Sequence, residues 1–284
     1  MCLILIAHRA HPRYPLVVAA NRDEWFRRPS APAAFWEDAP DVLAGRDLEQ
    51  GGTWLGVTRS GRFAALTNFR EPGAHRAEAP SRGALVSDFL RGREATLEFL
   101  ARLAPHAARY NGFNLVTWDG ETLAATSNRN GSTHPLGAGV FGLSNHLLDT
   151  PWPKVREGRI GLAALLAREV SVEALLELLD DTRIAEDREL PDTGVGLEWE
   201  RRLSPLRIVA ADYGTRCSTV LLVDREGGVE LAERTFAPNG TPAGLVRERF
   251  TLVAQAPRPL ERPCSDPHSS FSPRERAGGR FEPG

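Results

Sequence analysis

The sequence has 284 residues, of which 42% are hydrophobic and 25% are charged, with a formal net charge of −2. Such a chain can bury a substantial core without a metal or a disulfide, and its charge excludes the basic footprint of a nucleic-acid-binding protein. The three cysteines lack paired spacing, which indicates a reducing compartment. No apolar stretch reaches membrane-spanning length, so a cytoplasmic protein is expected, with its oligomeric state left open.

The first predicted elements are two short apolar runs, residues 3–7 and 16–20, with a polar turn between them. Runs of this length that are rich in Leu, Ile and Val are typical of buried strands, and together they predict a hairpin. Cys2 begins the first strand, and the sequence Asn-Arg-Asp-Glu at 21–24 leaves the second. The hairpin therefore places a thiol beside a cluster of charge, and leaves open which of the four side chains face Cys2.

Strands and helices are predicted in groups along the rest of the chain. A Pro-rich loop is expected over 27–40 and an exposed acidic loop over 186–200. The predicted strands are 53–57, 62–69, 113–118, 122–127, 139–145, 206–210, 217–223 and 229–235, with a further short pairing at 250–252. The predicted helices are 81–90, 94–103, 151–167 and 171–179.

The order of these elements indicates the fold class and the domain boundary. Neighbouring strands form antiparallel hairpins with helices grouped between them, which favours an α+β layered fold over a doubly wound parallel sheet. Two facing sheets with helices outside would fit the pattern, although periodicity alone does not establish that arrangement. From residue 256 the chain is rich in Pro, Arg, Ser and Gly, so we expect one domain over 1–255 and a disordered tail over 256–284 that exposes Cys264.

The position of Cys2 suggests nucleophilic chemistry. Removal of Met1 is expected because the Cys2 side chain is small, and it would leave Cys2 with a free α-amine of pKa ~8. That amine can act as the base for the thiol of the same residue. A neighbouring Arg would favour the thiolate. The alternative is that Cys2 is a small buried hydrophobe, the common fate of a free cysteine.

A set of motifs extends from residue 1 to about 252. The motifs are Cys2, Asn-Arg-Asp-Glu at 21–24, Gly-Gly-Thr-Trp-Leu-Gly at 51–56, Leu-Thr-Asn-Phe at 66–69, Gly-Leu-Ser-Asn at 142–145, Asp-Thr-Pro-Trp-Pro-Lys at 149–154 and Tyr-Gly-Thr-Arg at 213–216. Together they resemble the NRDE family, the family of the transport and Golgi organisation protein 2. The resemblance implies a four-layer αββα sandwich of the N-terminal nucleophile (Ntn) hydrolase type. Eukaryotic relatives are linked to Golgi organisation, secretion, lipid metabolism and haem trafficking.

A more distant similarity is to the cysteine Ntn amidases, conjugated bile salt hydrolase and penicillin V acylase. It implies a nucleophilic Cys, an Arg–Asp pair, an oxyanion Asn, a second Asn and a late Arg. The amidases separate their Arg and Asp by two residues, so Asn21 and Glu24 remain alternatives for that pair. The residues matched in this way are Cys2, Arg22, Asp23, Asn68, Asn145 and Arg216.

Each matched residue has a chemical role and a structural alternative. Asn145 can donate to a developing oxyanion, Asp23 can hold the α-amine of Cys2, and Arg22 or Arg216 can favour the thiolate. Alternatively, Asn145 caps the turn before the next helix, Asp23 and Arg22 form a surface ion pair, and Arg216 faces solvent.

Two functions fit the sequence. In the first, the protein is a cysteine amidohydrolase or thioesterase that forms an acyl-Cys2 intermediate with a small acylated substrate. In the second, the same pocket only binds a ligand such as haem or an acyl-CoA-like lipid. No cofactor or metal site is expected, because neither a His-Glu-x-x-His helix nor a Cys-x-x-Cys pair occurs, and His8 and His11 are expected to be solvated in a turn.

Overall fold

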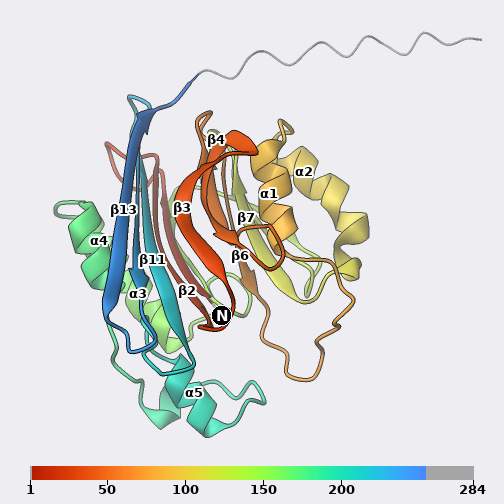
Figure 1. The fold of residues 1–284 in the computed structure, drawn as a ribbon. Helices are drawn as coiled ribbons and strands as arrows, with labels where there is room; N and C mark the ends of the chain where they lie inside the picture. Colours follow the sequence, from red (N-terminus) through yellow and green to blue (C-terminus); the bar gives the residue numbers. More distant parts are fainter. Residues whose placement is uncertain (1, 254–284) are drawn as a thin grey trace, which may run out of the picture. The chain divides into compact units, whose positions relative to one another are not determined.

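The computed structural model describes residues 2–253, which form two antiparallel sheets (Figure 1). In spatial order, the first sheet contains β10 (Gly139–Leu143), β1 (Cys2–His8), β2 (Leu16–Trp25), β11 (Tyr213–Val223), β12 (Gly228–Phe236) and β13 (Pro242–Thr251). The second contains β3 (Ser30–Trp36), β4 (Ala39–Asp47), β5 (Leu55–Thr58), β6 (Phe63–Asn68), β7 (Phe113–Trp118), β8 (Leu123–Ser127) and β9 (Thr133–Leu136). The tail expected over 256–284, with Cys264, lies outside the described residues.

Helices cover the outer face of each sheet. α1 (Gly83–Arg91) and α2 (Thr96–Leu103) pack on the second sheet, and α3 (Pro153–Leu166) and α4 (Val172–Leu178) pack on the first. α5 (Leu197–Leu203) lies below the strand ends of the first sheet (Figure 1), and short 3₁₀ turns occur at Ala104–Arg109 and Asp187–Glu189. The predicted α+β fold with four αββα layers is confirmed. Within residues 2–253, no helix is both long and apolar enough to cross a membrane.

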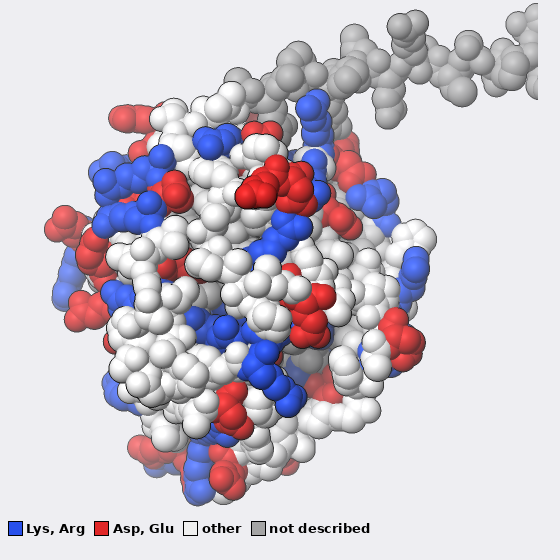
Figure 2. All heavy atoms as spheres, viewed as in Figure 1, with Lys and Arg blue, Asp and Glu red and all other residues white. Residues whose placement is uncertain are grey.

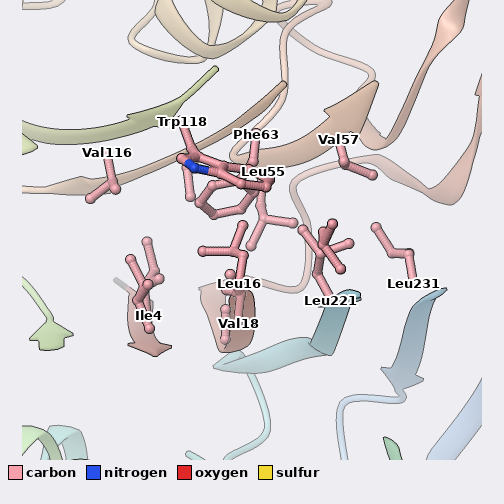
Figure 3. Close-up of a cluster of buried hydrophobic side chains, with 14 of the residues drawn as sticks. Ile4, Leu16, Val18, Leu55, Val57, Phe63, Val116, Trp118, Leu221 and Leu231 are labelled. Atoms are coloured by element: carbon pink, nitrogen blue, oxygen red, sulfur yellow. The ribbon is translucent and has the colours of Figure 1, made fainter. Parts of the chain in front are cut away.

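The largest core lies between the two sheets. Ile4, Val18 and Leu221 of the first sheet face Phe63 and Val116 of the second (Figure 3). All five side chains are at most 2% exposed. Full burial of an aliphatic or aromatic side chain contributes ~1.5–3 kcal/mol, so this layer holds the sheets together.

β1 and β2 are buried on both faces. Ile4 and Val18 point between the sheets, whereas Leu5 and Val17 point toward the helices on the outer face. α3 lies so close to β1 that a Cβ on Gly158 would be 2.8 Å from the Leu5 side chain. Burial on both faces explains why these strands read as continuous apolar runs rather than as alternating patterns.

Four expectations from the sequence are wrong. The exposed loop expected over 186–200 contains a 3₁₀ turn and the start of α5, where Glu200 is 3% exposed. The loop expected over 27–40 is β3 and the start of β4; β3 is an edge strand with register shifts, where Pro32 costs no ladder hydrogen bond. The strand expected over 206–210 is irregular backbone. His8, expected to be solvated, ends β1 at 2% exposure with Nδ1 at 3.0 Å from the carbonyl oxygen of Gly137.

Candidate functional site

Cys2, Arg22 and Cys217 lie side by side in β1, β2 and β11. Arg22 is the cross-strand partner of Cys2 on one side and of Cys217 on the other. Paired residues of antiparallel strands point to the same face of a sheet. Because Val18 and Ala20 of β2 face the inter-sheet core, Arg22 and its two neighbours face it too. The strand register therefore places one guanidinium between two thiols.

A cleft of about 330 Å³ opens where the two sheets separate beside Cys2. The first sheet contributes Cys2, Arg22 and Glu24 to its wall, and the second contributes Trp54 and Asn68. The other charged or basic residues that line it are Asp23, Arg28, Asp47, Glu49, His75, Arg76 and Arg82. Figure 2 shows basic side chains gathered near the centre of this face with acidic ones among them. The cleft is thus lined by charges of both signs.

Arg22 is the most enclosed cation on the inner side of this cleft. The residue is 6% exposed, and its guanidinium carbon lies 4.3 Å from the ring centroid of Trp54. Trp54 lies over Gly45, where a Cβ would come within 2.2 Å of the indole, so only glycine permits this packing. Among the described residues, Nη1 of Arg22 has no hydrogen-bond partner. The stacked guanidinium therefore has one buried N–H group that no described residue pairs with.

The sequence suggested that a neighbouring Arg favours the thiolate of Cys2. In the structure the pKa of the Cys2 thiol is instead raised. Burial raises its pKa and the negative charge of Asp23 adds to this, whereas the positive charges of the N-terminal amine and of Arg22 oppose the increase only in part. The reason is that the strand pairing that brings Arg22 to Cys2 also buries the thiol. Attack by this sulfur would therefore depend on a base that removes its proton.

Asp23 points to the opposite face of the first sheet, away from Arg22. It accepts a hydrogen bond of 2.6 Å from the Thr215 hydroxyl, and Nζ of Lys154 lies 3.6 Å from its other carboxylate oxygen. Asp23 and Lys154 are each 1% exposed. Burial raises the pKa of Asp23 and lowers the pKa of Lys154, and the attraction between the two charges opposes both shifts. The alternative of a surface ion pair between Asp23 and Arg22 is therefore wrong.

Asn145 lies behind Asn68 rather than on the cleft wall. Its amide nitrogen donates to the Asn68 carbonyl at 2.8 Å, its own carbonyl accepts from the Arg70 backbone at 2.7 Å, and it is fully buried. Ser144, the residue before it, donates to the Cys2 carbonyl at 3.0 Å. Asn145 therefore fixes the end of β6 against the end of β10, while Asn68 lines the cleft.

Arg216 is the extra residue of a bulge in β11, between Thr215 and Cys217. Its Nη1 donates to the backbone carbonyls of Trp25 and Arg28 at 3.0 and 2.8 Å. A bulge redirects the side chain of its extra residue, which explains why Arg216 does not join the row beside Cys2. The structure thus brings together Cys2, Arg22 and Asn68 at the cleft, with Asp23 and Asn145 behind them and Arg216 supporting the segment after β2.

Three further residues belong to the site but were not assigned from the sequence. Lys154 and Thr215 hold Asp23, and both lie inside motifs that the sequence shows, so their motifs were the available signal. Arg82 stands at the start of α1, lines the cleft and donates to the Gly112 carbonyl. No sequence pattern distinguished Arg82 from the other arginines of the chain.

Comparisons with known proteins give one family and a set of remote structures. A family model described as Transport and Golgi organisation 2 matches residues 1–238. The Transport and Golgi organization protein 2 homolog of Bos taurus is 37% identical over 259 residues, which cover 83% of this chain and 93% of that protein. The Homo sapiens homolog is 35% identical over 263 residues, with 83% and 93% covered.

Two solved structures align over most of the chain at low similarity. An N-acylethanolamine-hydrolyzing acid amidase ortholog of Caenorhabditis elegans has a TM-score of 0.46 and 11% identity, covering 78% of this chain and 92% of that one. A variant of the conjugated bile acid hydrolase of Clostridium perfringens has a TM-score of 0.47 and 8% identity, covering 90% and 99%. At these scores the likeness carries no argument about activity.

Proposed function

This chain belongs to the Transport and Golgi organisation 2 family, and on the geometry of its cleft we propose that it is a cysteine hydrolase that cleaves an amide or thioester bond of a small acylated substrate. The observation that carries the proposal is the Cys2 thiol, which lines a cleft at the start of β1 directly beside the partly unpaired guanidinium of Arg22. A merely structural cysteine requires neither the cleft nor the cation.

The reaction would proceed through an acyl-enzyme on Cys2. In the chain that lacks Met1, the α-amine of Cys2 accepts the thiol proton while the sulfur attacks the substrate carbonyl carbon. The bond to the leaving amine or thiol then breaks, and the leaving group takes that proton. Water attacks the acyl-Cys2 thioester next and passes its proton to the same amine. Cleavage of the carbon–sulfur bond releases the carboxylic acid and restores the thiol.

Asp23 and Lys154 would support this base from the opposite face. The carboxylate of Asp23 lies in β2 directly after Arg22, the strand partner of Cys2, and is held by Thr215 at 2.6 Å. An ionised carboxylate fixed there can orient the α-amine through a charge-assisted hydrogen bond. Lys154, at 3.6 Å, favours the ionised form of Asp23.

The oxyanion of the tetrahedral intermediate needs an amide donor. Asn68 lines the cleft, and its side-chain amide is the donor that we propose. Asn145 fixes the Asn68 backbone through its bond to the Asn68 carbonyl, so its part in this proposal is to position Asn68. Arg216 is proposed to act indirectly, through the backbone that it holds. It anchors the carbonyls of the segment that follows Glu24, which is a cleft-lining residue.

The test exploits the requirement for a free α-amine. An N-terminal tag turns the Cys2 nitrogen into an amide, which is not basic, but keeps the thiol. Tagged protein should fold and fail to form an acyl adduct, and protease cleavage that exposes Cys2 should restore the adduct. If tagged and cleaved proteins acylate at the same rate, the α-amine is not the base and this mechanism is wrong.

The second function, a binding protein for haem or an acyl-CoA-like lipid, is favoured by one observation. Because burial raises the pKa of the Cys2 thiol, the sulfur is protonated at neutral pH unless a base acts on it. The names of the relatives refer to transport and Golgi organisation, which agrees with a carrier. Equal ligand affinity in wild-type and Cys2→Ser protein, with no adduct in either, would favour this function over hydrolysis.

A further inference from the structure

A second cavity of about 580 Å³ lies beside the Cys2 cleft, and we call it the aromatic lobe. Its apolar wall is built by six residues from three parts of the chain, namely Trp25, Pro72, Val195, Trp199, Leu203 and Tyr213. Its volume is within the range of about 300–1,000 Å³ that is usual for small-molecule sites. The proposed reaction at Cys2 gives this lobe no role.

The aromatic side chains brace one another. Trp25 and Tyr213 are cross-strand partners in β2 and β11, and their rings meet edge to face at 5.2 Å between centroids. Trp199 of α5 completes the group, with centroids 6.4 Å from Trp25 and 6.1 Å from Tyr213. Such contacts fix ring positions, so the lobe is a formed surface rather than a collapsed one.

Two charged groups on the rim of the lobe, Arg70 and Glu71, are paired, and a third, Glu24, lies where the lobe meets the Cys2 cleft. Arg70 forms an ion pair of 2.6 Å with Glu200, and the two side chains are 6% and 3% exposed. Glu71 is paired with Arg129. A wall of aromatic and aliphatic groups, with Arg70 and Glu71 both paired, favours an uncharged, apolar occupant away from Glu24.

The aromatic lobe adjoins the Cys2 cleft. Glu24, Asn68 and His75 line both cavities. Glu24 lies two residues along β2 from Arg22, the partner of Cys2, which corresponds to ~7 Å at the usual rise of a strand. A molecule whose carbonyl carbon lies at the Cys2 sulfur can therefore extend past Asn68 into the lobe within a few bond lengths.

We propose that the aromatic lobe binds the apolar acyl chain of the substrate, and that the polar leaving group lies in the charge-lined cleft beside Cys2. The substrate class is therefore an amide or thioester of a medium-chain or longer carboxylic acid, rather than of acetate. This inference rests on the proposed hydrolase function for the position of the scissile bond. Occupation of the lobe by an apolar chain does not depend on catalysis.

The consequence is a dependence on chain length. Each methylene that enters an apolar site is stabilised by ~0.8 kcal/mol, which corresponds to about fourfold in an equilibrium or rate constant. The rate of Cys2 acylation per substrate concentration should thus rise about fourfold per methylene until the lobe is full. The measurement uses acyl thioesters with one common leaving group and chains of increasing length from acetyl, followed by intact-mass spectrometry.

Two substitutions alter the lobe at residues that do not line the cleft beside Cys2, and a third substitution outside the lobe serves as a control. Val195→Trp should fill the lobe and abolish the advantage of long chains. Trp199→Ala removes a wall instead and should flatten the chain-length dependence, so it tests the proposal even if Val195→Trp fails to fold. Leu197→Ala, on the same helix as Trp199 but 49% exposed and outside the lobe, should match the wild type.

A binding experiment separates this inference from the proposed function. In Cys2→Ala protein, free fatty acids should quench tryptophan fluorescence with an affinity that rises with chain length, and Val195→Trp should remove that rise. If this occurs while no thioester acylates the wild type, the hydrolase proposal fails and the lobe assignment stands. If all chain lengths acylate Cys2 equally and fatty acids do not bind, the lobe assignment is overturned and the hydrolase proposal stands.

Discussion

The two sides of Arg22 differ in access although they share a strand register. Cys2 and Cys217 are both paired with Arg22, and both point between the sheets. Cys2 lines the cleft. Cys217 is 4% exposed and lines neither the cleft nor the aromatic lobe. On the Cys217 side lies the buried carboxyl of Glu233, and the charge of Arg22 partly opposes the increase in the pKa of that carboxyl. The comparison indicates that access, rather than proximity to the cation, makes Cys2 the candidate nucleophile.

The Cys217 side is a closed hydrogen-bond network. Glu233, 2% exposed, accepts from the Ala33 backbone at 2.7 Å and from the Thr219 hydroxyl at 3.3 Å. Burial raises the pKa of Cys217 well above its ordinary value, and the nearby Glu233 carboxyl adds to the effect. A thiol that is both closed off and protonated can pack and donate a hydrogen bond, but it cannot reach a substrate.

The largest expected effect is on turnover when each thiol is replaced in turn. Cys2→Ser should abolish hydrolysis of an acyl substrate, because a hydroxyl is a far weaker nucleophile at neutral pH. Cys217→Ser should keep turnover close to wild type, with the loss confined to stability. Steady-state hydrolysis assays on both variants test this; a Cys217→Ser protein that folds but is inactive would remove the distinction between the two sides.

The next effect separates the two asparagines on the Cys2 side. Asn68→Ala should lower kcat ~10²–10³-fold, as loss of an oxyanion donor does, while folding stays nearly intact. Asn145→Ala should instead destabilise the fold by ~1–3 kcal/mol, because the half-buried Asn68 carbonyl loses the donor that the buried Asn145 supplies. Urea unfolding and kinetics of both variants decide the matter. Should Asn145→Ala retain full stability and lose the larger part of kcat, Asn145 would be the oxyanion donor.

The difference in access can be sharpened by alkylation. Cys2 should react with iodoacetamide at least ~10-fold faster than Cys217 at neutral pH, because Cys217 reacts only when the sheet opens locally. Site-resolved peptide mass spectrometry after timed labelling measures both rates in one sample. An inert Cys2 beside a reactive Cys217 would contradict the comparison.

The smallest expected effect is a pH dependence of the free energy of unfolding that arises from Glu233, on the Cys217 side of Arg22. Burial raises the folded pKa of Glu233 above its unfolded value of about 4.5, although the backbone amide of Ala33 and Arg22 oppose this increase. The contribution of Glu233 to the free energy of unfolding of the wild type is therefore fully present below pH 4.5. This contribution is lost as the pH rises through the folded pKa of Glu233. The loss is ~1.4 kcal/mol for each pH unit that separates the folded pKa from the unfolded one.

Glu233→Gln removes that titration. The free energy of unfolding of Glu233→Gln, relative to wild type, should increase with pH above 4.5 and then level off. Urea titrations at a series of pH values provide the measurement. Parallel pH profiles for the two proteins would show that Glu233 titrates alike in the folded and unfolded states.

The sequence predicted the hairpin because burial on both faces leaves uninterrupted apolar runs in β1 and β2, whereas the layer order followed only from the family resemblance. The sequence also grouped Cys2, Arg22 and Asn68, through its similarity to the cysteine Ntn amidases. It could not predict the β11 bulge that turns Arg216 away, because a bulge depends on pairing with β2. Nor could it distinguish the two faces of β2 beyond residue 21, so the separation of Arg22 from Asp23 became visible only in the register.

The central claim is that Cys2 carries a covalent acyl group during turnover. Wild-type protein with a free Cys2 amine should be mixed with a long-chain acyl thioester, quenched in acid within the first turnovers and analysed by intact-mass spectrometry and peptide mapping. We predict a mass increase equal to the acyl group, located on Cys2 and absent from Cys2→Ser protein. Hydrolysis without any adduct at early times, or an adduct of equal yield in Cys2→Ser protein, would contradict the claim.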